Sequence, residues 1–157
     1  MTAQSNADTL ITIFGGSGFL GRHVVGALAR REYRIRVAVR RPDLTGHLQP
    51  LGRVGQIHAV QANVRNRTSV AAAARGSDVV INLVGILFET GKQSFEAVQA
   101  LGAESVALAA AAEGAAMIQV SAIGADPNSP SAYARAKAEG ERLVLAEIGR
   151  ASCRERV

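Results

Sequence analysis

The sequence predicts an α/β domain built on a doubly wound parallel sheet. Three observations favour this class: apolar runs of strand length alternate with longer helix-like stretches, the connections between them are short, and a glycine-rich turn over residues 15–21 directly follows the first run. Strands that alternate with helices in this way pair in parallel through right-handed crossovers. We therefore expect a Rossmann-type sheet with the strand order 3-2-1-4-5.

The first half of the chain supplies three expected strands and two expected helices. Leu10–Phe14 is a short apolar run, and Arg34–Val39 alternates basic with apolar side chains until Pro42 ends regular structure. Between these two runs, apolar residues recur at helical spacing. The expected elements are a strand over 10–14, a helix over 18–31, a strand over 34–39, a helical turn over 47–53, a strand over 56–61 and a helix over 68–75.

The second half begins with the almost continuously apolar run Asp78–Val84, which suits a parallel strand buried on both faces. Ser94–Ala112 is alanine-rich, with large apolar residues at helical spacing, and predicts a long helix. Met117–Val120 is the expected fifth strand. A loop with two prolines then leads to a last helix that begins at about Ser131.

The C-terminal end resembles the translation of a widely used sequencing adapter. We therefore interpret residues 148–157 as a non-native artefact tail, with an ordinary basic terminus as the alternative. On this interpretation residues 1–147 form one domain, a fragment of a longer protein that is truncated before the later strands of the fold. No linker or charge block within the fragment indicates a second domain.

Without that tail the composition is only mildly basic. The chain has 18 Lys and Arg against 13 Asp and Glu, a net charge of +5, and the loss of three arginines and one glutamate with the tail leaves +3. Aromatic residues make up 4%, so no nucleic-acid partner is expected. The one cysteine lies in the tail and the three histidines lack metal-ligand spacing, so we expect no metal. The absence of a signal peptide and of a transmembrane segment predicts a soluble, cytoplasmic protein.

The glycine-rich turn is the strongest functional signal. A strand, a glycine turn and a helix together hold a dinucleotide pyrophosphate at the helix N-terminus, where unpaired N–H groups and the helix dipole favour an anion. In this arrangement Gly15 takes the turn conformation, Gly18 lets the backbone approach the phosphates and Gly21 lets the helix pack on the strand. We assign cofactor binding to Gly15, Gly16, Ser17, Gly18, Phe19, Leu20 and Gly21.

Two arginines at the end of the second expected strand indicate which dinucleotide is bound. NAD-binding proteins usually place Asp or Glu there to hold the ribose 2′-hydroxyl, whereas this chain has Arg40 and Arg41. A guanidinium forks well onto a phosphate and cannot accept a hydrogen bond. The pair predicts NADP(H) as the preferred cofactor, and NAD(H) is the alternative if both arginines are merely solvated.

Three further positions follow expected strands three and four. Asn63 lies where a side chain often hydrogen-bonds the adenine amino group, although an asparagine in a turn is an equally good explanation. Val84 and Gly85 would let the backbone pass close to the nicotinamide ribose, with a simple turn glycine as the alternative. We assign all three residues to cofactor binding.

Candidate catalytic residues lie near the last helix. Tyr133 and Lys137 are spaced i, i+4 and so share one helix face. A lysine ammonium beside a phenol favours the phenolate and lowers the tyrosine pKa, which suits proton transfer near neutral pH. Ser121 ends the fifth expected strand, where its hydroxyl would face substrate or cofactor or cap the following loop. In the functional interpretation Lys137 also contacts the cofactor. The alternative is a surface tyrosine with a solvated lysine.

These motifs resemble the short-chain dehydrogenase/reductase superfamily in its extended or atypical branch. The resemblance rests on residues 15–21, on Tyr133-Ala134-Arg135-Ala136-Lys137 and on Ser121, and it spans residues 10–146. The sequence is more similar still to bacterial relatives of the NADPH-binding accessory subunit of respiratory complex I, through residues 14–22, 38–42, 81–87 and 120–125. That family implies a bound NADP(H) and, for the mitochondrial member, a stabilising rather than a catalytic role.

The chain departs from the enzymatic members at one position. These members usually carry a hydroxyl further into the loop after strand five, where this chain has Ala122 and Ile123. The departure favours a cofactor-binding module, for which the resemblance implies a respiratory-complex partner at the periphery of the inner membrane. The intact Tyr133–Lys137 pair favours the alternative, an NAD(P)-dependent reductase, epimerase or dehydratase.

Overall fold

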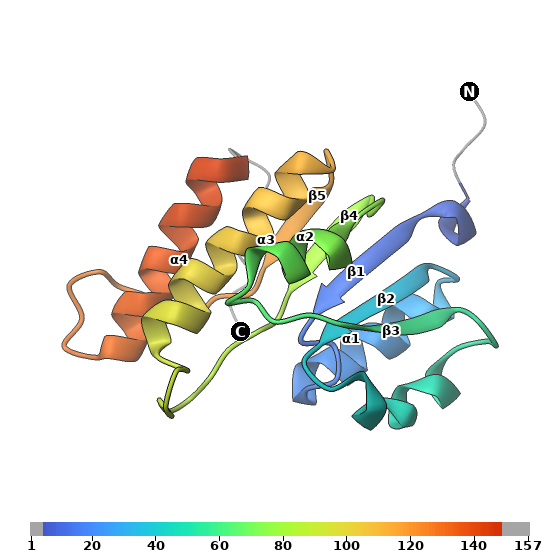
Figure 1. The fold of residues 1–157 in the computed structure, drawn as a ribbon, viewed down its shortest axis with the longest axis horizontal. Helices are drawn as coiled ribbons and strands as arrows, with labels where there is room; N and C mark the ends of the chain where they lie inside the picture. The colour runs from blue at the N-terminus through green and yellow to red at the C-terminus, as the bar shows by residue number, and fades with distance from the viewer. Residues whose placement is uncertain (1–4, 149–157) are drawn as a thin grey trace.

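The computed structural model describes residues 5–148. Five parallel strands form one sheet in the order β3-β2-β1-β4-β5 (Figure 1), which confirms the predicted order. The strands are β1 Leu10–Phe14, β2 Arg34–Val39, β3 Ile57–Gln61, β4 Val79–Asn82 and β5 Ala116–Gln119. The winding reverses between β1 and β4, and the carboxyl ends of strands at such a switch point are where α/β sheets bind ligands.

Helices cover both faces of the sheet (Figure 1). The helix α1 Phe19–Arg30 and the 3-10 turn η3 Gly46–Leu51 share a hydrophobic core with one face, next to the shorter turns η1 Asn6–Asp8 and η2 Pro42–Leu44. The other face carries the helices α2 Arg67–Ala74, α3 Leu101–Ala112 and α4 Ala132–Ile148. The described part of the chain therefore has three layers. Of the predicted artefact tail, residues 148–157, only Ile148 lies within the described residues, as the last residue of α4.

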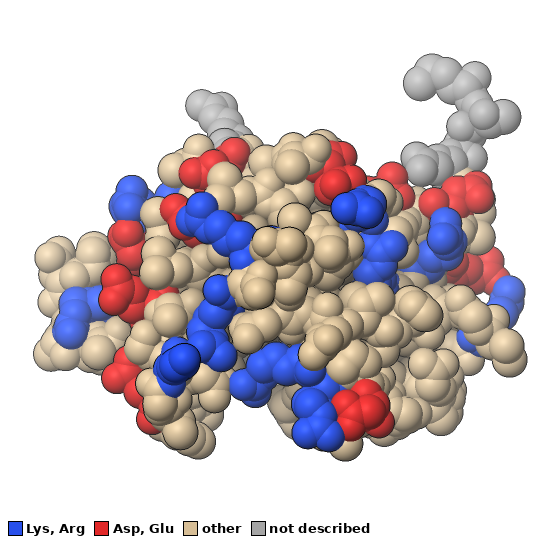
Figure 2. All heavy atoms as spheres, in the orientation of Figure 1, with Lys and Arg blue, Asp and Glu red and all other residues tan. Residues whose placement is uncertain are grey.

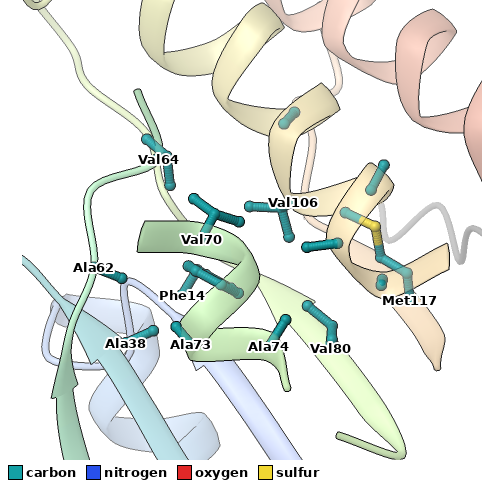
Figure 3. Close-up of a cluster of buried hydrophobic side chains, with 14 of the residues drawn as sticks. Phe14, Ala38, Ala62, Val64, Val70, Ala73, Ala74, Val80, Val106 and Met117 are labelled. Atoms are coloured by element: carbon teal, nitrogen blue, oxygen red, sulfur yellow. The ribbon is translucent and has the colours of Figure 1, made fainter. Parts of the chain in front are cut away.

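Two hydrophobic cores hold these layers together. Figure 3 shows the core beneath α2 and α3, where Phe14 of β1 lies among Val70, Val80 and Val106. Ile13, next to Phe14 along the strand, points to the other face, because successive side chains in a strand alternate. Both side chains are almost completely buried, so β1 is the central strand of the fold.

Two predicted elements are shorter than expected. The strand predicted over 78–84 ends at Asn82, because the Asn82 Oδ1 accepts a hydrogen bond from the Val84 N–H at 3.1 Å and turns the chain away from the sheet. The helix predicted over 94–112 begins with a π-helical segment, η4 Glu96–Ala100, before α3 starts. π-Helical turns of this kind frequently mark functional sites.

Gly140 of α4 packs directly against this π-helical segment. A Cβ placed on Gly140 would clash with the carbonyl oxygen of Gln99. We therefore expect Gly140→Ala to lower the free energy of unfolding by about 1–3 kcal/mol, the usual cost of overpacking. Chemical denaturation measures this, with Gly124→Ala as the control, because a Cβ on Gly124 would meet no atom within 4 Å. Equal stability of the two variants would contradict the tight contact.

Candidate functional site

A cleft of about 270 Å³ opens at the carboxyl ends of β1, β2, β3 and β4. It lies beside the switch point, where the sequence placed the cofactor. Its walls come from the loops that follow these four strands and from the start of the π-helical segment. The residues that line it are Phe14, Gly15, Ser17, Gly18, Ala38, Val39, Arg40, Ala62, Asn63, Val64, Arg65, Leu83, Val84, Gly85, Ile86, Gln93 and Val98.

The glycine-rich turn forms the floor of the cleft. Gly15 has a φ of 78°, a conformation that favours glycine, and a Cβ on it would lie 3.2 Å from the Val84 backbone nitrogen. Gly18 is the N-cap residue of α1 and offers no side-chain acceptor to the first helical N–H groups. A Cβ on Gly18 would approach only the Gly15 carbonyl oxygen, at 3.4 Å, so this side of the turn is otherwise open. The turn thus has the free donors and the space that a pyrophosphate requires.

The remaining residues of the turn have different surroundings. Ser17 lines the cleft with Gly15 and Gly18. Gly16 and Gly21 pack inward: a Cβ on Gly16 would lie 2.9 Å from Val37 Cγ1, and one on Gly21 would lie 2.5 Å from the Gly15 carbonyl oxygen. The Phe19 and Leu20 side chains are exposed and are absent from the cleft lining, so only their backbone N–H groups at the start of α1 fit the predicted cofactor contact.

The two arginines predicted to bind phosphate, Arg40 and Arg41, have different surroundings in the structure. Arg40 lines the cleft, and its Nη1 donates a hydrogen bond to the Gln93 Oε1 at 2.6 Å. Arg41 is not part of the lining and instead forms a forked pair with Asp43, at 3.0 and 2.7 Å. This hydrogen bonding holds the pKa of the Asp43 carboxyl below its ordinary value. Arg40 is therefore the better placed of the two to meet a ligand.

The segment that follows β4, residues 86–95, is named here the 86–95 strap and is drawn yellow-green in Figure 1. It contributes Ile86 and Gln93 to the cleft lining. Its tip is a tight turn in which Thr90 and Gln93 exchange backbone hydrogen bonds of 3.1 and 3.0 Å around Gly91, whose φ is 56°. Gln93 holds Arg40, and the backbone carbonyl of the exposed Lys92 accepts a contact from Arg65 Nη1 at 3.4 Å. The strap thus joins the ends of β2, β3 and β4 on one side of the cleft.

Asn63 lies in the cleft wall and also shapes the turn after β3. Its Oδ1 accepts the Arg65 N–H at 3.1 Å, and its own N–H donates to Ser69 Oγ at 2.8 Å. The asparagine side chain therefore has the local turn role that was its alternative explanation. Asn63 also lines the cleft, and its contact with the adenine stays a prediction.

Lys137 lies at the opposite end of the site, beside Gly85. A Cβ placed on Gly85 would be 3.5 Å from the Lys137 Nζ, so the glycine leaves room for the ammonium. Only 7% of Lys137 is exposed, and this burial lowers its pKa, opposed in part by the charge of Glu141. Tyr133, one helical turn earlier, packs edge-on against Phe95 with ring centroids 5.7 Å apart. The buried Ser121 Oγ has no hydrogen-bond partner among residues 5–148.

The buried charge of Lys137 has a consequence for stability. We expect Lys137→Met to raise the free energy of unfolding of the ligand-free protein at pH 7, because an apolar side chain of similar length avoids the desolvation cost. The Lys137 pKa is lower in the folded than in the unfolded chain, so the wild type gains stability as the pH rises from the folded value toward 10.5. Denaturation at pH 7 and pH 10 should show the advantage of the variant shrinking. An advantage that grows with pH would contradict it.

Gln99 was not among the residues predicted from the sequence. It is 2% exposed within the π-helical segment, and neither its Nε2 nor its Oε1 has a hydrogen-bond partner in the described chain. Its Oε1 lies 3.8 Å from the position that a Cβ on Gly85 would occupy, beside Lys137. A buried amide without partners costs free energy. Gln99 is the one amide in the predicted helix 94–112, which also carries Glu96 and Glu104, so the sequence alone did not single it out.

No group of three or more His, Cys, Asp or Glu side chains among residues 5–148 could hold a metal ion. No helix within that range is long and apolar enough to cross a membrane.

Comparison with known proteins places this geometry among dinucleotide-binding domains. A family model described as NAD(P)H-binding matches residues 15–152, a range that extends a few residues into segment 148–157. The chain is 40% identical over 145 residues to the mitochondrial NADH dehydrogenase [ubiquinone] 1 alpha subcomplex subunit 9 of Arabidopsis thaliana, covering 90% of the chain and 36% of that protein. It is 35% identical over 142 residues to a ceramide reductase of Caulobacter vibrioides, covering 90% of the chain and 44% of that protein. The chain thus spans less than half the length of these relatives.

Solved structures share the fold at low sequence identity. The Bordetella bronchiseptica enzyme WbmH in complex with NAD+ superposes with a TM-score of 0.77 at 15% identity, over 94% of this chain and 55% of that one. The enzyme WbmG of the same organism, in complex with NAD and UDP, superposes with a TM-score of 0.70 at 18% identity, over 86% and 48%. At these identities the likeness concerns the fold.

Proposed function

Because the chain belongs to the NAD(P)H-binding family, we propose that it is the cofactor-binding domain of an atypical short-chain dehydrogenase/reductase and that it prefers NADP(H). The observation that carries the proposal is the cleft floor, where the open side of Gly18 and the uncapped start of α1 face the space lined by Arg40. The turn supplies N–H donors for the pyrophosphate, and Arg40 supplies a guanidinium for the 2′-phosphate. The cofactor would supply hydride chemistry, while these residues bind and orient it.

The NADP(H) preference is tested by comparing two cofactors and one variant. We expect NADPH to bind at least about tenfold more tightly than NADH, because a charge-assisted hydrogen bond to the 2′-phosphate adds binding free energy. Arg40→Ala should remove most of this preference and leave NADH affinity nearly unchanged. Titration by NADPH and NADH fluorescence measures both. Equal affinities in the wild type would contradict the preference.

We further propose that the complete protein holds NADP(H) as a bound group within a larger assembly. Relatives named as complex I subunits support this, as does the loop after β5, which carries Ala122 and Ile123 where enzymatic members usually have a hydroxyl. On this proposal the protein is cytoplasmic and lies at the periphery of the inner membrane, in contact with a respiratory complex. Co-purification of the full-length protein with complex I from the source membrane tests it, and recovery only in fractions free of the complex would contradict it.

A specific feature favours a second function, that of an enzyme. Lys137 is buried beside Gly85, one turn after Tyr133, and this burial lowers its pKa, as happens to titratable groups at active sites. On this alternative the full-length protein is an NAD(P)-dependent reductase, epimerase or dehydratase. In it Tyr133 transfers a proton, Lys137 holds the tyrosine in its reactive form, and Ser121 faces the substrate. Turnover by the full-length protein separates the two functions.

A further inference from the structure

We infer that Arg65 is a specificity-determining residue that binds the 2′-phosphate of NADP(H) together with Arg40, and that Arg41 does not take part. The inference rests on the proposed function and names a residue that the sequence did not single out. The predicted pair Arg40 and Arg41, which are adjacent in the sequence, is thus replaced by Arg40 and Arg65, which line the same cleft.

The sheet brings the two arginines together. Arg40 directly follows β2, and Arg65 lies four residues after the end of β3. These strands are adjacent and parallel, with Val39 paired to Gln61, so both chains leave the sheet at the same edge. Both side chains line the same cleft. Figure 2 shows basic side chains gathered across the lower middle of the face on which the ends of β2 and β3 lie.

The charges of these two arginines are not compensated within the described chain. Arg40 donates to the neutral amide oxygen of Gln93, and Arg65 contacts the backbone carbonyl of Lys92. Among residues 5–148 neither guanidinium forms an ion pair with a carboxylate. Two positive charges held by neutral acceptors at one cleft favour an anion.

Arg41 and Arg67, which lie near these two arginines in the sequence, each form an ion pair with a carboxylate. Arg41 is paired with Asp43 at 2.7 Å, and Arg67 is paired with Glu104 at 2.6 Å. Neither of them lines the cleft. To bind a phosphate, each would first have to give up a carboxylate partner, whereas Arg40 and Arg65 have no such partner among residues 5–148.

The 86–95 strap contacts both guanidinium groups. Gln93 and Lys92 are consecutive residues at its tip, and each holds one arginine through a single acceptor. A guanidinium has five N–H donors, so both arginines keep donors for the three terminal oxygens of a phosphate. On this inference one phosphate dianion binds two guanidinium groups, Arg40 from the loop after β2 and Arg65 from the loop after β3.

The test compares three single variants on three ligands. We expect Arg65→Ala to weaken binding of NADPH and of adenosine 2′,5′-bisphosphate by about tenfold, and to change NADH affinity by less than about twofold. Arg67→Ala is the matched control, because it removes an arginine two positions away that is paired with Glu104. Arg41→Ala should behave like this control. Arg65 is exposed, so circular dichroism and thermal melting should show all three variants folded.

The outcomes separate this inference from the proposed function. A wild type that binds neither dinucleotide would overturn the proposed function, and this inference with it. A wild type that prefers NADPH, combined with an Arg65→Ala variant that keeps the full preference, would overturn the inference alone. Equal weakening of NADPH and NADH would also overturn it, because Arg65 would then contact a part that the two cofactors share.

Discussion

Replacing Gly18 with valine is expected to abolish dinucleotide binding while leaving the fold almost intact. Gly18 has extended backbone angles that any residue adopts, and a Cβ there would meet only the Gly15 carbonyl oxygen at 3.4 Å. The added methyl groups therefore cost the ligand-free protein little. They would occupy the space through which the pyrophosphate must approach the N–H groups of α1. Isothermal titration with NADPH should show no binding where the wild type binds, with a melting temperature within a few degrees.

Gly21 provides the contrast that makes this result interpretable. A Cβ on Gly21 would lie 2.5 Å from the Gly15 carbonyl oxygen and from the Gly16 backbone, neither of which can move without opening the turn. Gly21→Ala should therefore destabilise the whole fold by several kcal/mol, as overpacking against the backbone does. Loss of binding in Gly21→Ala would come with a lower melting temperature, and in Gly18→Val without one. If folded Gly18→Val bound NADPH normally, the pyrophosphate would not lie at this turn.

Replacing Tyr133 with phenylalanine is expected to lower turnover of the full-length protein about a hundredfold, if that protein is an enzyme. The substitution removes only the hydroxyl, so the edge-on packing against Phe95 is kept and NADPH affinity should change by less than about twofold. Steady-state kinetics with carbonyl and sugar-nucleotide substrates, alongside NADPH titration, measure the two effects.

The chain contains its own control for this experiment. Tyr33 is the only other tyrosine, and it packs against the core on the α1 face, outside the cleft lining. Tyr33→Phe should leave turnover unchanged, whereas Lys137→Ala should reduce both turnover and NADPH affinity because Lys137 serves the tyrosine and the cofactor. Full turnover in Tyr133→Phe and in Lys137→Ala would exclude this pair as the catalytic residues. A wild type without turnover would favour the binding module.

The strands β1 and β2 could be predicted to the residue, whereas the end of β4 and the shape of the helix after it could not. The limits of β1 and β2 follow from apolar runs bounded by the glycine turn and by Pro42, signals that lie within a few residues of one another. The π-helical segment packs against Gly140, which is 41 positions away from Gln99 in the sequence. Apolar spacing indicates a helix there but not which hydrogen-bond pattern the helix adopts.

The difference between local signals and contacts of distant residues also explains which residues of the cofactor site could be predicted. Residues of the glycine turn act through local backbone geometry, so their spacing alone placed Gly15 and Gly18 in the cleft. The arginines act through their neighbours in space. The contacts of the strap with Arg40 and Arg65 join residues 53 and 27 positions apart, so they depend on how the loops meet above the sheet. Arg41 differs, because its partner Asp43 is only two positions further along the chain. A local pattern predicts such residues as candidates but cannot choose between them.

The positions of the two lysines allow changes at the cleft to be measured by the rate at which each lysine is chemically modified. The sequence contains only Lys92 and Lys137, and they lie at opposite extremes of accessibility: one on the exposed tip of the 86–95 strap, the other buried beside Gly85. An amine-reactive reagent followed by peptide mass spectrometry would therefore modify Lys92 quickly and Lys137 slowly, with no engineered label. A dinucleotide bound in the cleft should protect Lys92 only if the strap tip closes on it. Labelling of Lys137 would instead measure how often the packing between α4 and the sheet opens. The same mass-spectrometry experiment therefore measures closure of the strap tip through Lys92 and local unfolding through Lys137.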